Sequence, residues 1–118
     1  MHDLAGAIGK FLAARREAQT RFLADLVKGP SDNPPGDCRP NAERAAALLG
    51  ELGCKVELHA VPQAAVRAAG MISCTNLIVR ERFGAGGPVV ALNAHGDVVP
   101  PGLGWSTDPY GAEIRDGR

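Results

Sequence analysis

Apolar residues recur at helical spacing through the first quarter of the chain, which predicts one long amphipathic helix over residues 3–28. Asp3 is placed to cap its first turn, and Gly29-Pro30 ends it. The apolar positions are Leu4, Ile8, Phe11, Ala18, Phe22 and Leu26.

The next stretch, GPSDNPPGDCRP at residues 29–40, predicts a loop. Its prolines remove backbone donors, and its Ser, Asp and Asn side chains bond their own backbone. A second helix is expected from Asn41, a good N-cap residue, to Leu52. Gly53 stands where a C-terminal glycine belongs.

Period-two alternation then predicts strands. In residues 55–61 the apolar and polar positions alternate, as in a half-exposed strand. A connector with weak helical character, 62–70, leads to a second strand at 75–80. The nearly continuous apolar run 89–94 is typical of a strand covered on both faces. Residues 112–118 suggest a fourth strand that runs into a turn.

This order of elements predicts an α/β fold with a sheet of mixed direction flanked by helices. We divide the chain into a helical start, 3–53, and a sheet portion, 54–118. A complete domain of this class needs more strands and covering helices, so we expect an interrupted domain.

Composition narrows the function. The 118 residues include 13 Lys plus Arg and 13 Asp plus Glu, so the net charge is near zero. Nucleic acid and anionic membrane surfaces attract a basic excess, and neither is an expected partner. No apolar run approaches the roughly 18 residues of a membrane span, and charges interrupt any secretory signal. We expect a cytoplasmic protein. Its cysteines, expected to be reduced, are Cys38, Cys54 and Cys74.

Chemistry-bearing side chains follow the last apolar run, in NAHGDVVPPGLGWSTDPYG at residues 93–111. His95 and Asp97 share a face if the chain stays extended through Gly96. Ligands of open α/β sheets bind beyond the carboxyl ends of strands. A metal-ligating histidine usually donates its other ring N–H to a carboxylate or carbonyl. His95 is therefore the candidate metal ligand, with Asp97 as its partner.

One histidine does not make a metal site, because zinc normally takes at least three protein ligands. The plain alternative is a buried histidine satisfied by a nearby acid, or a turn aspartate that bonds its own backbone. Other candidate ligands have simpler explanations. His59 lies on the polar face of its strand, His2 lies near a terminus, and turn chemistry explains Asp32 and Asp37.

The wider context resembles a known family. NAHGDVVPPG followed by GWSTDPYGAEIRDGR closely resembles the first metal motif of the acetylornithine deacetylase / succinyl-diaminopimelate desuccinylase family of dinuclear-zinc peptidases and amidohydrolases. The stretches PSDNPPGD, ELGCKVEL and TNLIVR match the family's opening in the same order. The resemblance spans residues 20–118.

The resemblance implies a role for each matched residue. His95 matches the first zinc ligand. Asp97 matches the catalytic-site aspartate behind it, which orients that ligand and supports the catalytic base. A loop after the strand matches the family's brace near the site, although packing onto the core is the simpler explanation for its two aromatic residues. The loop residues are Trp105, Asp108, Pro109 and Tyr110.

The resemblance also implies a fold and a reaction. The chain would be the N-terminal part of a zinc-peptidase-like catalytic domain that cleaves an amide bond of an N-acyl amino acid or small peptide. Two zinc ions would activate water and polarise the carbonyl, and a glutamate would move the proton. Cobalt and manganese are alternatives to zinc.

The bridging aspartate, the glutamate base, the other ligands and a dimerisation domain are expected beyond Arg118. We therefore expect this chain alone to be inactive and the complete protein to be a homodimer. Two other readings stay open: a non-catalytic α/β module that binds a partner through an exposed sheet edge, and a generic α/β domain in which H-x-D is accidental.

Overall fold

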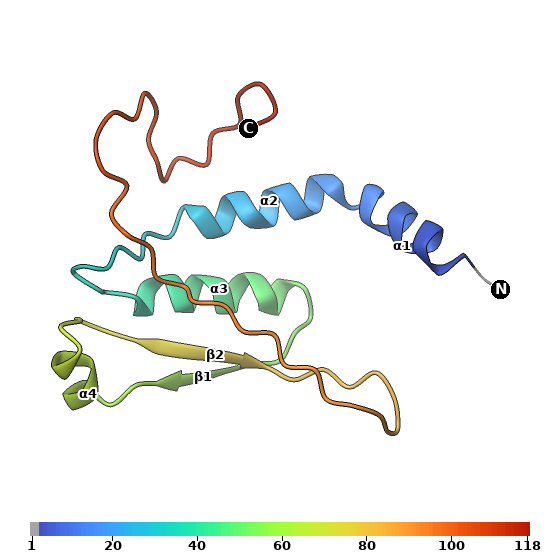
Figure 1. Cartoon of the computed structure of the whole chain (residues 1–118), viewed down its shortest axis with the longest axis horizontal. Coiled ribbons are helices and arrows are strands. Elements are labelled where there is room, and N and C mark those ends of the chain that lie inside the picture. Colours follow the sequence, from blue (N-terminus) through green and yellow to red (C-terminus); the bar gives the residue numbers. More distant parts are fainter. Residues whose placement is uncertain (1–2) are drawn as a thin grey trace.

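The computed structural model describes residues 3–118, so His2 lies outside the described residues. Helices come first and a small sheet follows, an arrangement compatible with part of an α/β fold (Figure 1). From Arg80 to Arg118 the chain runs through turns and irregular segments. The elements in order are α1 (Leu4–Ala13), α2 (Arg16–Val27), α3 (Arg39–Glu51), β1 (Val56–Ala60), α4 (Gln63–Ala68) and β2 (Thr75–Val79).

Helix α3 lies between α2 and the sheet and contacts α2 and both strands (Figure 1). The strands are antiparallel, with Val56 opposite Val79 and Ala60 opposite Thr75. The expected sheet of mixed direction is therefore wrong: within residues 3–118 the sheet is this single antiparallel pair. The core is small, and its buried apolar residues are Ala42 on α3 and Val66 on α4.

The prediction of one helix over residues 3–28 is wrong, because the chain breaks between α1 and α2. Arg15 leaves helical geometry, with φ −114° and ψ 10°, and its N–H bonds the carbonyl of Leu12 at 3.1 Å in a tighter turn. Its guanidinium lies 3.6 Å from the centre of the Phe11 ring, a cation–π contact. The predicted cap is confirmed, since Asp3 Oδ1 accepts from the N–H of Gly6 at 2.9 Å.

The second helix begins earlier than predicted. α3 starts at Arg39 with Cys38 in the N-cap position, so the assignment of Asn41 as N-cap is wrong. A proline in the first turn suits this start, because its missing N–H would have no helical partner there. The Asn41 side chain instead donates to the carbonyl of Gly29. Gly53 follows the last turn with φ +85°, as predicted for a C-terminal glycine.

Two of the four predicted strands form. The predictions at 55–61 and 75–80 are confirmed by β1 and β2, and the weakly helical connector contains α4. The predictions at 89–94 and 112–118 are wrong. A strand needs a neighbour for its backbone groups, and 89–94 has none in the described chain. Residues 115–118 instead close a turn, in which Arg115 and Arg118 exchange backbone hydrogen bonds of 2.9 Å.

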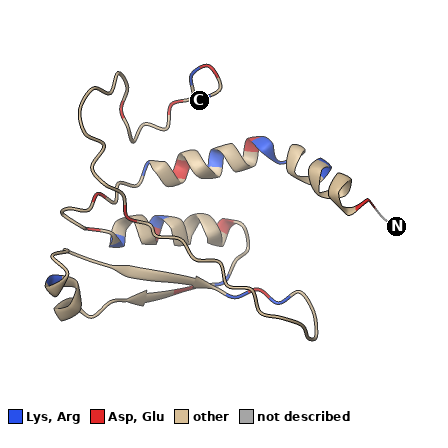
Figure 2. Ribbon diagram, viewed as in Figure 1, with Lys and Arg blue, Asp and Glu red and all other residues tan. Residues whose placement is uncertain are grey.

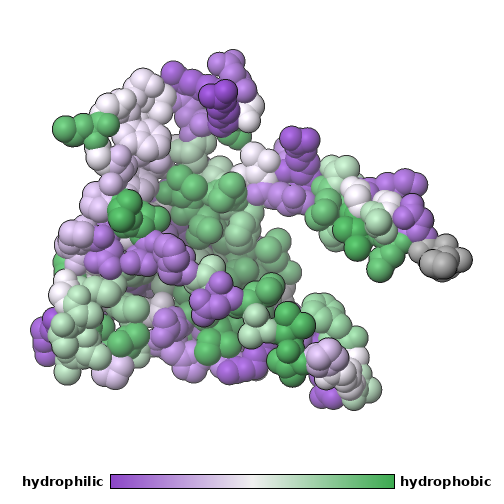
Figure 3. Space-filling view, viewed as in Figure 1, coloured by the Kyte–Doolittle hydropathy of each residue, from purple (hydrophilic) through white to green (hydrophobic). Residues whose placement is uncertain are grey.

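Unpaired segments leave apolar side chains in water. Leu92 and Leu103 are almost fully exposed, and Figure 3 shows apolar residues along α1 and over the middle of the molecule. Charged residues of both signs are interspersed along α2 and α3 (Figure 2). None of the helices within residues 3–118 has both the length and the apolarity to cross a membrane.

The small core makes Val66 a sensitive position. Val66 is 2% exposed, so Val66→Ala removes buried methyl groups and should lower the free energy of unfolding by about 1–2 kcal/mol. Val89 is 96% exposed, and Val89→Ala, the matched control, should change it by less than about 0.5 kcal/mol. Urea unfolding of both variants measures the difference. Equal losses would show that α4 does not hold the core together.

Candidate functional site

A short backbone pairing fixes the position of the His95–Asp97 segment. The N–H of Asn33 donates to the carbonyl of Val98 at 2.8 Å, and the N–H of Val98 donates to the carbonyl of Ser31 at 3.1 Å. These bonds form a parallel bridge between Asp32 and Val98. The proline-rich loop thus holds the residues that follow His95, although 64 residues separate Asn33 from Asp97.

Ser31 adds a side-chain bond to this pairing. Its hydroxyl donates to the carbonyl of Gly96 at 2.6 Å, and the residue is 4% exposed. A buried hydroxyl needs such a partner, because an unsatisfied one costs about 1–3 kcal/mol. Gly96 also passes close to α3: a Cβ at this position would lie 3.6 Å from Oδ1 of Asn41.

His95 and Asp97 contact each other directly. Nδ1 of His95 lies 3.1 Å from Oδ1 of Asp97 and 2.8 Å from its carbonyl oxygen. Both partners are acceptors, so a neutral ring carries its proton on Nδ1 and its lone pair on Nε2. The histidine side chain is 85% exposed. The alternative of a buried histidine satisfied by an acid is therefore wrong, whereas a ring held at Nδ1 with Nε2 free is the usual state of a metal-ligating histidine.

The other oxygen of the same carboxylate has its own donor. Nδ2 of Asn33 lies 3.0 Å from Oδ2 of Asp97. The bond from Asn33, and more weakly that from His95, holds the pKa of Asp97 below its ordinary value of 3.8, against the opposing effect of desolvation. Asn33 was not predicted as a site residue, because turn chemistry explained the loop that carries it. The available signal was that PSDNPPGD, which contains Asn33, and NAHGD, which contains Asp97, match stretches of the same family in the same order.

A groove of about 1090 Å³ surrounds these residues. It lies between the helices, the sheet and the segment that carries His95 and Asp97. Three of the four predicted brace residues line it, namely Trp105, Pro109 and Tyr110. Cys38 and Cys74 line it as well, and all three cysteines are free. Burial, with Asp97 and Cys74 nearby, raises the pKa of the Cys38 thiol, so this thiol is a poor nucleophile.

The predicted brace loop is held mainly by its own contacts. Nε1 of Trp105 donates to the carbonyl of Pro101 at 2.8 Å. Asp108 Oδ1 accepts from the N–H of Tyr110 at 2.9 Å, the local turn bond typical of aspartate. Asp108 is thus explained as a turn residue, while the two aromatic side chains face the groove.

Tyr110 also approaches the proline-rich loop. Hydrogen bonding to the Asp32 carboxylate, burial and the charge of that carboxylate raise the pKa of Tyr110 to about 12. The hydroxyl of Tyr110 is buried within residues 3–118 and lies beside this anion.

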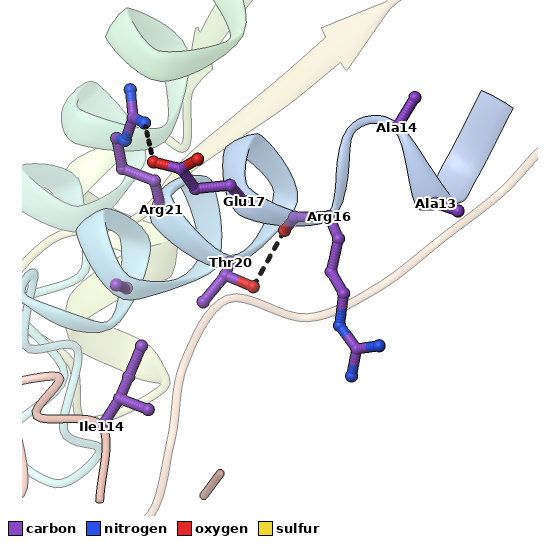
Figure 4. A pocket seen from close by; sticks show the side chains of 8 residues that line it. Ala13, Ala14, Arg16, Glu17, Thr20, Arg21 and Ile114 are labelled. Atoms are coloured by element: carbon purple, nitrogen blue, oxygen red, sulfur yellow. Dashed lines mark hydrogen bonds and ion pairs between the residues drawn. The ribbon is translucent and has the colours of Figure 1, made fainter. Parts of the chain in front are cut away.

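A second hollow, of about 710 Å³, lies at the junction of α1 and α2 and is reached by Ile114 (Figure 4). Its charged groups are already engaged or point to solvent. Arg21 pairs with Glu17 at 3.1 Å, and Thr20 donates to the carbonyl of Arg16 at 2.9 Å. Such an exposed ion pair has little effect on stability, and this hollow does not carry the chemistry of a site.

The other residues that were considered as ligands and given simpler explanations lie elsewhere. His59 is on β1, where its Nε2 lies 3.3 Å from Oε2 of Glu57, and Asp37 accepts from the hydroxyl of Ser73. In the part of the chain from residue 3 onward, no three His, Cys, Asp or Glu side chains come together to hold a metal ion. His95 and Asp97 are the pair around which a site can be argued.

Comparison with known proteins identifies the chain's relatives. The succinyl-diaminopimelate desuccinylase of Xanthomonas euvesicatoria is 39% identical over 82 residues, which cover 63% of this chain and 20% of that protein. That of Wolinella succinogenes is 52% identical over 42 residues (36% and 11%), and that of Anaplasma marginale is 35% identical over 72 residues (61% and 17%). The resemblance to the acetylornithine deacetylase / succinyl-diaminopimelate desuccinylase family is confirmed.

The similarity is partial in extent. This chain spans a fifth or less of the length of these three relatives. No family model matches it, and no solved structure matches it. The family resemblance therefore rests on sequence.

The single tyrosine of the chain allows its environment to be measured. Because the pKa of Tyr110 is raised from 10 to about 12, its stabilising contribution is complete below pH 10 and is lost as the pH rises through 12. Phenolate absorbance should give a midpoint well above 10 in the folded chain and near 10 in urea. Asp32→Asn should lower the folded midpoint, whereas Asp37→Asn, in the same loop, should not. No response to Asp32→Asn would mean that burial alone causes the shift.

Proposed function

We propose that residues 1–118 are the N-terminal part of a metal-dependent amide hydrolase, in which His95 is a metal ligand and Asp97 orients it. The observation that supports this most is the held ring: Nδ1 of His95 contacts two oxygens of Asp97, while the side chain is 85% exposed. Burial does not explain such a ring. Presentation of Nε2 to a ligand is the explanation that this geometry supports.

The residues fit one corner of a metal centre. An imidazole nitrogen suits zinc, with cobalt and manganese as the alternatives, and a carboxylate on the other ring nitrogen is its common companion. A zinc site takes at least three protein ligands. On this proposal the others, the glutamate base and the dimerisation domain come from outside residues 1–118, and the complete protein is a cytoplasmic homodimer.

Each residue has a defined task in this proposal. His95 Nε2 would hold the metal, and Asp97 fixes the tautomer that frees this nitrogen. The groove beside them, lined in part by Trp105 and Tyr110, would shield the site from water. Two zinc ions, when bound, supply Lewis-acid polarisation of a carbonyl and activation of water.

The proposed substrate is the amide of an N-acyl amino acid or a small peptide. The names of the matched relatives describe removal of a succinyl group from a diamino acid, and that reaction cleaves an amide bond. The acyl group and amino acid would be selected by residues outside this chain.

A second candidate function is partner binding without catalysis. It is favoured by the exposed apolar side chains between residues 83 and 105, with Phe83 and Leu92 among the most exposed, because large exposed apolar patches mark interaction surfaces. Zinc-independent association with a partner, unaffected by His95→Ala, would favour this reading over the hydrolase.

Metal binding tests the hydrolase proposal first. Zinc added to chain labelled with ¹⁵N-histidine should perturb Nε2 of His95 before the ring of His59, because Nε2 of His59 already contacts Glu57. The response should vanish in His95→Ala, persist in the matched control His59→Ala, and reverse with a chelator. Zinc that perturbs His59 at lower concentration than His95 would contradict the assignment.

Activity provides the second test. We expect zinc-loaded residues 1–118 not to hydrolyse N-succinyl or N-acetyl amino acids above a zinc-only blank, since one histidine cannot hold two ions. Joined to the remainder of the proposed enzyme, Asp97→Asn should lower metal affinity or activity by about 10–100-fold. Chelator-sensitive hydrolysis by the 118 residues alone, lost in His95→Ala, would show that the chain holds further ligands.

A further inference from the structure

The two oxygens of the Asp97 carboxylate have different partners. Oδ1 faces Nδ1 of His95 at 3.1 Å, and Oδ2 accepts from Nδ2 of Asn33 at 3.0 Å. The bond to Asn33 is partly buried, whereas the contact with His95 lies at the surface. A carboxylate held on its inner oxygen cannot rotate freely, so the direction of its outer oxygen is set from the loop side.

We propose that Asn33 is a positioning residue of the candidate site: its amide fixes the Asp97 carboxylate so that the free oxygen faces Nδ1 of His95 and leaves Nε2 for the ligand. The relevance of this positioning to a metal rests on the proposed function. The hydrogen bonds from Asn33 to Asp97 and from His95 to Asp97 are observed independently of that function.

The backbone keeps Asn33 in register with its target. Its own N–H donates to the carbonyl of Val98, the residue after Asp97, at 2.8 Å, and Val98 returns a bond to Ser31 at 3.1 Å. The amide of Asn33 therefore starts from a backbone already tied to the segment that it grips. This double attachment pre-organises the side chain, which lowers the entropy lost when the bond forms.

A glycine makes room for this amide. At Gly36, with φ +78°, a Cβ would come within 3.1 Å of Oδ1 of Asn33 and 2.8 Å of Cγ of Met71. A side chain there would crowd the asparagine and would also be strained by the positive φ. The loop thus spares the space that the amide of Asn33 occupies.

The tautomer of His95 distinguishes positioning from a purely structural role in the loop. The Asp97 carbonyl would still accept from Nδ1 if the carboxylate swung away, so loss of Asn33 should weaken the Nδ1–H tautomer without abolishing it. Asp97→Ala removes the carboxylate, and the change that it causes in the fraction of Nδ1–H tautomer is the reference for the other variants. We expect Asn33→Ala to reproduce most of the change that Asp97→Ala causes.

The experiment is ¹⁵N NMR of the histidine rings in the metal-free chain at about pH 8, above the ordinary histidine pKa of about 6.5. The variants are Asn33→Ala and Asn33→Asp, and the second keeps the side-chain volume but replaces the donor with a carboxylate that repels Asp97. Asn76→Ala, at the exposed position of β2, is the matched control and should leave His95 unchanged. His95→Ala identifies the signals, and the amide spectrum of β1 and β2 reports folding.

The outcomes separate this inference from the proposed function. A His95 tautomer at its wild-type value in both Asn33 variants, or no excess of Nδ1–H in the wild type, would overturn it. If Asn33→Ala disturbs the amide signals of β1 and β2, the His95 tautomer measured in Asn33→Asp is the test of the inference. A tautomer that responds to Asn33 in a chain whose His95 ignores zinc supports positioning and contradicts the metal role. Where zinc does bind, Asn33→Ala should weaken zinc affinity by about 10-fold or less. Loss of a group that hydrogen-bonds a metal ligand directly costs about 10–100-fold, and Asn33 contacts the ligand only through Asp97.

Discussion

The pairing of the proline-rich loop with residues 96–98 is the constraint on which the candidate site depends. In the described chain, the hydrogen bonds that residues 96–98 make with residues 3–80 all end on Ser31 or Asn33, and Tyr110 approaches Asp32 of the same loop. The last third of the chain otherwise runs without a strand partner. Its position relative to the helices is therefore set at this one point, which is also where His95 and Asp97 lie.

These hydrogen bonds give the candidate site a defined geometry in a chain that buries few apolar side chains. Among the described residues, Ala42 and Val66 form the buried apolar core. Ser31 is about as buried, and its hydroxyl donates to the carbonyl of Gly96. Polar contacts, and not apolar packing, hold the candidate site. Such contacts fix geometry well but add only about 1 kcal/mol each to stability, so a precise local arrangement can coexist with a weak fold.

Sequence patterns correctly predicted the features that depend on interactions between residues close together in the chain. The Asp3 cap, the Gly53 terminus and both strands of the hairpin-like pair depend on neighbours in the chain, and each was found. The failures have a different cause. The run 89–94 has the composition of a buried strand, but composition cannot supply the neighbouring strands that bury it. The break at Arg15 was missed because apolar periodicity continues across it and does not register the change in backbone dihedrals of one residue.

The candidate site shows the same difference between contacts of near neighbours in the sequence and contacts of distant residues. Contact between His95 and Asp97 follows from their spacing, whereas the bond from Asn33 joins positions 64 residues apart and no periodicity encodes it. The exposure of His95 then changes the weight of the alternatives. A histidine satisfied within a core would hide its ring, and a turn aspartate would need no donor from another loop. Here the ring is exposed and the aspartate is held from its far side, an arrangement that agrees with the proposed presentation of Nε2 to a ligand.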